Sequence, residues 1–461
     1  MKIRKMKRIS CLCMVLCIVI AFLQPLSPNT AKAANKPSVF AHAYAIVDAN
    51  SQQLLLQYQA NKKIYPASTV KLMTALVVLD YCNTSDQITV TKTMLSKVSS
   101  SSAKVGLRAG DTYTVSSLLH MLLLPSAADA SYVLAYGSCG SLPTFLKQMN
   151  QKASAYGMTH TSFDNPVGLD KGDRYYKTYT TAKDFTILAR HAMSNATIRN
   201  IVAKASYRVP KAKHKKSFVI HSTNQFYRSV PYDRASYQII GTKTGTTRAA
   251  GSVLIATAKD KAGHEVICAF FGNRSHSTMY ADIRKLLDYI FKQENAGNLT
   301  LKKGFWDVRY TEEEDLIQTA YDEGLLSQAS RFYPEQAADQ TTLYQLINIF
   351  GNSNLQTTEE DADQPLSLLA FAQTFYNNYG GGQLPSCIAD LPETEWQAAM
   401  ANYCNSLNIV EELSQTDYMA LCFLIQNNLW NTKLPTDPSD SLTKSQAVLL
   451  GHEISTLQTT N

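Results

Sequence analysis

Apolar and polar residues alternate with the period of a β-strand near the start of the chain and again after residue 237. Between these regions apolar residues recur at the spacing of α-helices. The pattern predicts strands at 40–47, 54–58, 88–91, 239–242, 252–257 and 266–271, a lysine-rich hairpin at 207–220, and helices at 115–124, 142–156, 181–193 and 280–291, with another helix ending near 136. Strands at both ends with helices between them are typical of an α+β domain.

Ser68 and Lys71 open a long apolar run, and Pro66 suits a helix entry because its missing N–H costs nothing there. Positions i and i+3 lie on one helix face, so the hydroxyl and the amine would be neighbours. A serine is a weak nucleophile without a base, and burial lowers the pKa of an amine enough for it to act as one. The same spacing at 101–104 and 441–444 indicates solvated pairs, because neither opens an apolar segment.

The two ends of the chain differ in charge from its middle. Residues 1–33 carry six basic and no acidic residues. Five of the basic residues precede a mostly apolar stretch at 9–26, and a small-x-small site follows at 31–33. This is typical of a secretory signal peptide, with an uncleaved anchor as the alternative. Residues 34–300 carry 32 basic and 15 acidic residues, and 301–461 carry six and 22. We therefore predict a signal peptide at 1–33, a basic domain at 34–296 that carries Ser68 and Lys71, and an acidic region at 297–461.

The composition limits the kinds of partner and cofactor that the protein is expected to bind. A basic exported domain suits an anionic cell-wall polymer or a membrane surface, whereas the basic residues are not interleaved with aromatics as in a nucleic-acid site. The six cysteines after the signal lack Cys-x-x-Cys spacing and the histidines form no ligand-spaced pair, so we expect no metal and no cofactor. Free buried thiols are expected, with a disulfide within the group from Cys387 to Cys422 as the alternative.

Two further segments complete a candidate site. Ser126 lies between two predicted helices, where its side chain can project into a cleft. Lys243-Thr244-Gly245-Thr246 ends a predicted strand, where the glycine lets a substrate approach the backbone. Together with Ser68 and Lys71, these segments follow the order of the serine penicillin-binding proteins.

The likeness extends over about 42–291, which resembles the catalytic domain of the D-alanyl-D-alanine carboxypeptidases, the low-molecular-mass penicillin-binding proteins. It is carried by Pro66–Ala75, Gly106–Asp111, Asn165–Asp170 and Lys243–Gly251. The resemblance implies a penicillin-binding/β-lactamase-like fold, with an antiparallel sheet flanked by helices. It also implies an exported, cell-wall-associated serine peptidase that removes the terminal D-alanine from peptidoglycan stem peptides ending in D-Ala-D-Ala and is acylated by β-lactams.

The same resemblance assigns roles to three side chains in the chemistry. Ser68 attacks the carbonyl of the penultimate D-alanine, Lys71 is the general base, and Ser126 relays a proton to the leaving amine. A catalytically weak or silent protein that binds the cell wall is the alternative function.

Substrate binding is implied for the third segment. Lys243 and Thr244 hold the terminal carboxylate, and Gly245 permits the close approach. The N–H groups of Thr246 and Ser68 form the oxyanion hole.

The sequence departs from the family where its second motif, Ser-x-Asn, has Ala128 as its third residue. The asparagine would bond the substrate and the lysine, so restoring it is expected to raise acylation if the cleft has room. Ser222-Thr223-Asn224 has the motif's spacing but lies too near the third segment. No glutamate occurs between 34 and 264, which disfavours a class A β-lactamase because that class deacylates through a glutamate.

The acidic region does not resemble the β-rich C-terminal domain of many relatives. Short helices are expected near 316–320, 343–350, 366–376, 396–404, 418–426 and 445–454. Weak similarity to S-layer homology repeats occurs at 305–334 and 440–444, with an unclassified helical domain as the alternative.

Overall fold

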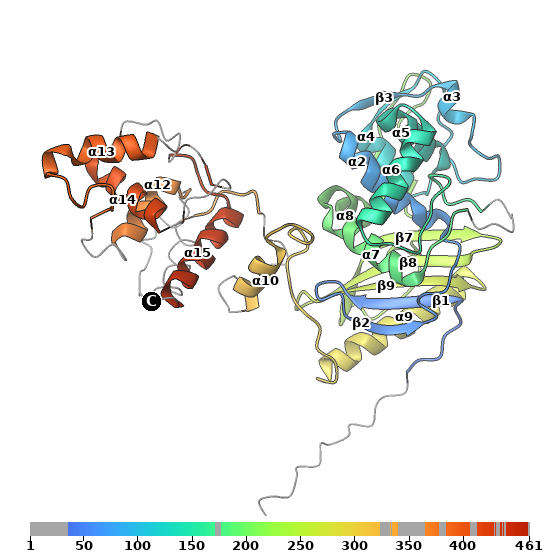
Figure 1. Ribbon diagram of the computed structural model, residues 1–461. Coiled ribbons are helices and arrows are strands. Elements are labelled where there is room, and N and C mark those ends of the chain that lie inside the picture. Colours follow the sequence, from blue (N-terminus) through green and yellow to red (C-terminus); the bar gives the residue numbers. More distant parts are fainter. Residues whose placement is uncertain are drawn as a thin grey trace, which may run out of the picture.

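One antiparallel sheet of five strands organises the first part of the molecule (Figure 1). In the order β2-β1-β9-β8-β7, its strands are Leu54–Tyr58, Ala43–Asp48, Glu265–Asn273, Gly251–Asp260 and Tyr237–Thr247. The computed structural model describes residues 36–170, 177–322, 332, 334–339, 365–377, 384–405, 413–427, 429, 434–435, 437 and 439–459. The α+β architecture predicted from the pattern is confirmed.

The alternation along each central strand gives the sheet two buried faces. In β8, Val253 and Ile255 enter the larger core, whereas Leu254 and Ala256 enter the core beneath α9 (His276–Asn295). The larger core is formed with α2 (Lys71–Tyr81), α4 (Val115–Leu123), α5 (Ala128–Cys139), α6 (Leu142–Ala155), α7 (Ala182–Ser194) and α8 (Ala196–Val202). Two nearly continuous apolar strand faces therefore place helices on both sides of the sheet.

Hydroxyl side chains set the starts of several helices. Thr114, Ser141, Thr181 and Ser275 each accept a hydrogen bond from the backbone N–H three residues later. Each such cap satisfies one of the N–H groups left unpaired at a helix start. Helix α7 begins at Ala182, so the start predicted at 181 is confirmed within a residue.

Short elements were harder to predict than long ones. The β-pattern locates β3 (Gln87–Thr89) and the hairpin of β5 (Ser206–Val209) and β6 (Phe218–His221), but not β4 (Thr112–Thr114) or α3 (Lys92–Leu95). Segments of three or four residues contain too few positions for a period to emerge. Strands β7 to β9 are longer than predicted because polar residues at their ends still pair in the ladder.

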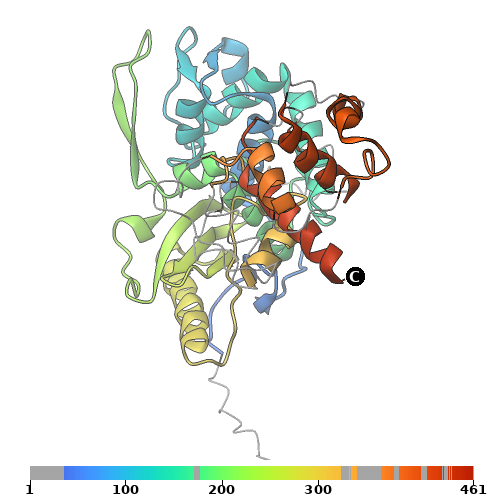
Figure 2. The same cartoon turned by 90° about the vertical axis from the view of Figure 1, so that its left-hand side faces the viewer.

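The acidic region is largely helical, as predicted. Its described helices are α10 (Glu314–Asp322), α12 (Leu368–Phe375), α13 (Glu393–Asn405), α14 (Gln415–Gln426) and α15 (Lys444–Thr459). Figure 1 shows α12 to α15 gathered apart from the sheet, and in Figure 2 the same helices lie in front of the rest of the molecule. They surround a separate core that includes Phe371 and Leu421. The predicted signal peptide and the predicted helix at 343–350 lie outside the described residues.

None of the helices in the described residues has the length and apolar character that crossing a bilayer requires. In the helical region the Sγ atoms of Cys404 and Cys422 lie 3.9 Å apart as free thiols, so the disulfide stays an alternative.

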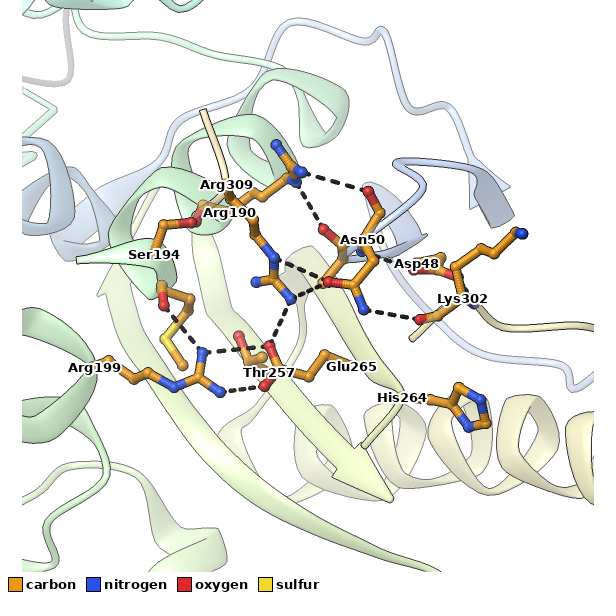
Figure 3. Close-up of polar contacts among 12 residues, drawn as sticks. Asp48, Asn50, Arg190, Ser194, Arg199, Thr257, His264, Glu265, Lys302 and Arg309 are labelled. Carbon is orange, nitrogen blue, oxygen red and sulfur yellow. Dashed lines mark hydrogen bonds and ion pairs between the residues drawn. The ribbon is translucent and has the colours of Figure 1, made fainter. Parts of the chain in front are cut away.

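The segment that leaves α9 docks on the far end of the sheet (Figure 3). Glu265, only 2% exposed, accepts hydrogen bonds from both Arg199 and Arg309. Arg309 also bonds Asn50, and Glu314 pairs with buried Arg190. This ion network fastens the first turns of the acidic region to the catalytic domain, so the two parts share contacts beyond the predicted boundary at 296.

We predict that Arg309→Ala lowers the free energy of unfolding by about 3 kcal/mol or more, because Glu265 keeps its charge in a buried place with one partner fewer. Thermal unfolding of the purified chain measures this. Lys302→Ala is the control, since its exposed ammonium lies 3.8 Å from Asp322. A melting temperature for Arg309→Ala equal to that of the control would show that the network does not stabilise the docking.

Candidate active site

Ser68 and Lys71 meet at the junction of two helical segments. A 3₁₀ turn, η1 (Ala67–Val70), runs directly into α2 (Lys71–Tyr81). The Nζ atom of Lys71 donates to Ser68 Oγ at 2.9 Å and to the carbonyl of Val167 at 3.1 Å. The structure therefore brings the predicted nucleophile and base into direct hydrogen-bond contact.

Two glycines allow the backbone to crowd around this turn. A Cβ at Gly245 would lie 3.0 Å from the backbone nitrogen of Ser68, and one at Gly168 would lie inside contact distance of the carbonyl of Ala67. Ala67 itself has a φ of 50°, which is uncommon for a residue with a Cβ. Strand β7 and the 165–170 loop are thus packed directly on the serine's turn.

Burial controls the charge of Lys71. Its side chain is 2% exposed, and this burial lowers the pKa of Lys71 to about 7, against a smaller opposite effect from the charge of Asp129. Near pH 7 a large fraction of the amine is consequently neutral and can accept a proton.

Lys243 lies close enough to Lys71 for the two charges to interact. Burial, and then the positive charge of Lys71, hold the pKa of Lys243 well below its usual value. Its Nζ donates to the carbonyl of Thr244 at 2.9 Å. A carboxylate bound here would stabilise the Lys243 ammonium, and that charge would in turn disfavour a proton on Lys71.

Hydroxyl groups gather beside Lys243 at the end of β7. Thr244 Oγ1 and Thr223 Oγ1 are 2.5 Å apart, and Thr223 also bonds the carbonyl of Leu124. Thr246 Oγ1 lies 2.5 Å from Nε2 of His276. Thr223 and His276 were not predicted as site residues, because their positions become visible only once β7 is placed.

Ser126 follows the end of α4, with a φ of 65°. Its hydroxyl is buried and has no hydrogen-bond partner among the described groups. Leu124, two residues earlier, contacts Thr223, which contacts Thr244. Ser126 is thereby linked to the Lys-Thr-Gly strand, while its direct contact with a substrate stays a prediction.

Ala128, which stands where the family has an asparagine, is buried among apolar side chains. Ala128 is 1% exposed and belongs to a small apolar cluster with Tyr132 and Val167. The carbonyl of Val167 supplies the acceptor for Lys71. Lys71 therefore has a backbone acceptor in the loop that packs against Ala128.

Asn165 builds the loop that presents this carbonyl. Its Oδ1 accepts from the backbone N–H groups of Val167, Gly168 and Leu169, at 3.2, 2.7 and 3.0 Å. Its Nδ2 donates to the carbonyl of Leu169 at 2.9 Å. Asn165 is thus a loop-shaping residue whose polar atoms are already engaged.

The other Ser-x-x-Lys pairs lack these features. Ser101 and Lys104 are both exposed, and Lys104 bonds a backbone carbonyl. Ser441 is exposed on an isolated bridge.

Among the described residues, Asp260, His264 and Glu294 form one cluster of the type that can bind a metal ion. The ring Nδ1 of His264 already lies 2.7 Å from Asp260 and 3.3 Å from Glu294, so these groups form an ion-paired cluster among themselves.

Comparison with known proteins identifies the family. The family model for D-alanyl-D-alanine carboxypeptidases, peptidase S11, matches residues 30–275. This chain belongs to the S11 D-alanyl-D-alanine carboxypeptidase family. It is 28% identical over 258 residues to DacF of Bacillus subtilis, covering 55% of this chain and 62% of that protein. It is 31% identical over 267 residues to DacB2 of Mycobacterium tuberculosis, covering 56% and 86%.

Solved S11-like structures give the same result for the fold. A D-alanyl-D-alanine carboxypeptidase from M. tuberculosis has a TM-score of 0.51 at 27% identity, covering 57% of this chain and 95% of that one. A DD-transpeptidase from Streptomyces has a TM-score of 0.50 at 29% identity, covering 55% and 98%. These matches leave the acidic helical region outside the shared S11 domain.

We predict that the second-order rate of acylation by a penicillin rises with pH through about 7 and then levels off. The reason is that only neutral Lys71 accepts the Ser68 proton, and the neutral form prevails above its pKa. Stopped-flow measurement between pH 5 and 10.5 tests this. A rate that keeps rising toward pH 10 would show that Lys71 titrates as an ordinary exposed lysine.

We also predict that Ala128→Asn lowers the melting temperature and does not raise acylation. The larger side chain must enter the packed cluster with Tyr132 and Val167, and overpacking costs about 1–3 kcal/mol. Ala128→Ser, which adds a single oxygen, is the matched smaller variant. An unchanged melting temperature with acylation raised threefold or more would restore the expectation drawn from the sequence.

Proposed function

We propose that the protein is an active serine D,D-carboxypeptidase that removes the terminal D-alanine from peptidoglycan stem peptides. The contact that supports this most strongly is the 2.9 Å hydrogen bond between Lys71 Nζ and Ser68 Oγ, made by a buried amine. Family membership supplies the substrate class. Export and a cell-wall location are part of the same proposal, since that is where the substrate lies.

The acylation step uses groups already in contact. Lys71 takes the Ser68 proton as Oγ attacks the carbonyl carbon of the penultimate D-alanine. Negative charge then develops on the carbonyl oxygen, and the N–H groups of Ser68 and Thr246 would stabilise it. The C–N bond breaks as the leaving amine receives a proton through Ser126 and Lys71, and D-alanine departs.

Substrate orientation rests on the Lys-Thr-Gly strand. The terminal carboxylate would lie against Lys243 and Thr244, and the charged bond would hold the scissile carbonyl over Ser68. Gly245 leaves room because the strand already approaches the serine's turn within contact distance. A β-lactam carries a carboxylate at a comparable place, so the same contacts would direct its acylation of Ser68.

In deacylation, water attacks the ester formed at Ser68 and regenerates the free serine. The first glutamate after residue 34 is Glu265, which is bound by Arg199 and Arg309 at the far end of the sheet. Activation of the water would therefore fall to Lys71, the base nearest the ester. This assignment favours a peptidase over a class A β-lactamase.

Ser68→Ala should reduce labelling by a fluorescent penicillin and release of D-alanine by about 10³-fold or more, because no other group replaces the nucleophile. Ser101→Ala is the matched control and should leave both unchanged. Labelling that persists in Ser68→Ala would overturn the nucleophile assignment. Wild-type protein that neither labels nor releases D-alanine would favour the silent wall-binding alternative.

A further inference from the structure

A cavity lies away from the serine, where the acidic region docks on the sheet. It has a volume of about 380 Å³ and is bounded by the start of β7, the end of β8, α8 and Trp306. Gln238 of its lining pairs with Lys259 across the two strands. Lys243 is five residues further along β7, about 16 Å away at the rise of a strand. The cavity is therefore separate from the candidate active site.

Four cationic side chains line this cavity, with one carboxylate, that of Asp260. Asp260 is committed to His264, whose Nδ1 is 2.7 Å from its Oδ2. Arg199 is committed to Glu265, and its guanidinium lies 4.6 Å from the ring centroid of Trp306. The cations left for a ligand are Arg234, Lys259 and Lys261.

Within the described part of the chain none of these three cations forms an ion pair, and Glu265, which faces Lys259 across the ladder, is bonded by Arg199 and Arg309. Arg234 lies over the ring of Tyr232, at 4.9 Å from its centroid, which restrains the guanidinium. Among the described residues, neither Lys259 nor Lys261 has a hydrogen bond or a contact ion pair. Lys259 is half-buried, and burial is the main reason that its pKa lies below the usual value. A bound anion would offset this cost of burying an ammonium.

We propose that this cavity binds phosphate groups of an anionic phosphodiester polymer. Arginine matches phosphate oxygens with its planar fork, and lysine adds compact charge. Lys259 lies half-buried in the recess, so a flexible chain that enters it would bring a phosphate to this amine. Trp306 forms one wall, so the site is complete only when the 301–309 segment is docked. Binding at this cavity would keep the catalytic domain attached to the polymer and leave the Ser68 site free for substrate.

The test is isothermal titration of the purified full chain with a glycerol-phosphate oligomer. Arg234→Gln with Lys261→Gln should weaken binding by about tenfold or more, since hydrogen bonds to charged groups are lost. Lys92→Gln with Lys147→Gln removes the same charge from exposed positions on α3 and α6 and should change binding less than twofold. Equal weakening in both double variants, or no binding by the wild type, would overturn the site.

Titration with three further ligands distinguishes which class of anion the cavity binds. Polyglutamate should bind the wild type more weakly than the phosphodiester oligomer, and equal affinity would overturn the assignment to phosphate. Tighter binding of pyrophosphate or of phosphatidylglycerol vesicles would overturn the polymer in favour of a free anion or a lipid surface. Penicillin acylation should be the same in all variants, so loss of this site and loss of the proposed peptidase are distinguishable.

Discussion

The hydrogen bond between Lys71 and Ser68 depends on an amine kept out of water. An exposed lysine would hold its proton at neutral pH, and the same contact would then place a cation beside an inert hydroxyl. Burial makes the free amine available. Helix α2, the 165–170 loop and strand β7 exclude water by packing on the turn that carries the serine, so the fold's principal contribution to chemistry is the environment of one nitrogen atom.

That environment needs precise packing of backbone as well as side chains. Gly168 and Gly245 have no Cβ where contact with the turn is closest, and the carbonyl of Val167 gives the amine a neutral acceptor. Asn165 fixes the loop that provides this carbonyl. Asp129 caps the backbone N–H groups of Gly106 and Leu107 at 2.8 and 3.0 Å, which ties the second segment to the loop before it. A substitution that removes one of these contacts would therefore change the environment of the Lys71 amine even though the substituted residue does not contact it.

The sequence predicts the long elements and the first and third motifs, because periodicity and short spacing are local properties. It does not reveal the acceptor at Val167, since a backbone carbonyl leaves no mark in the residue type. It places Asn165 in a segment that resembles the family, but the hydrogen bonds by which this side chain shapes the loop are visible only in the structure. Charge composition places a boundary near 300, but the pairing of Glu265 with Arg309 across that boundary is a tertiary contact between residues 44 apart.

The charge state of Lys71 can be observed directly by NMR of protein labelled with ¹⁵N at the lysine Nζ atoms, with Lys71→Arg used to assign its signal. The account predicts a Lys71 titration midpoint near pH 7, well below the usual range of a lysine. A midpoint near 10 in the folded protein would contradict the claim that burial makes this amine the base for Ser68.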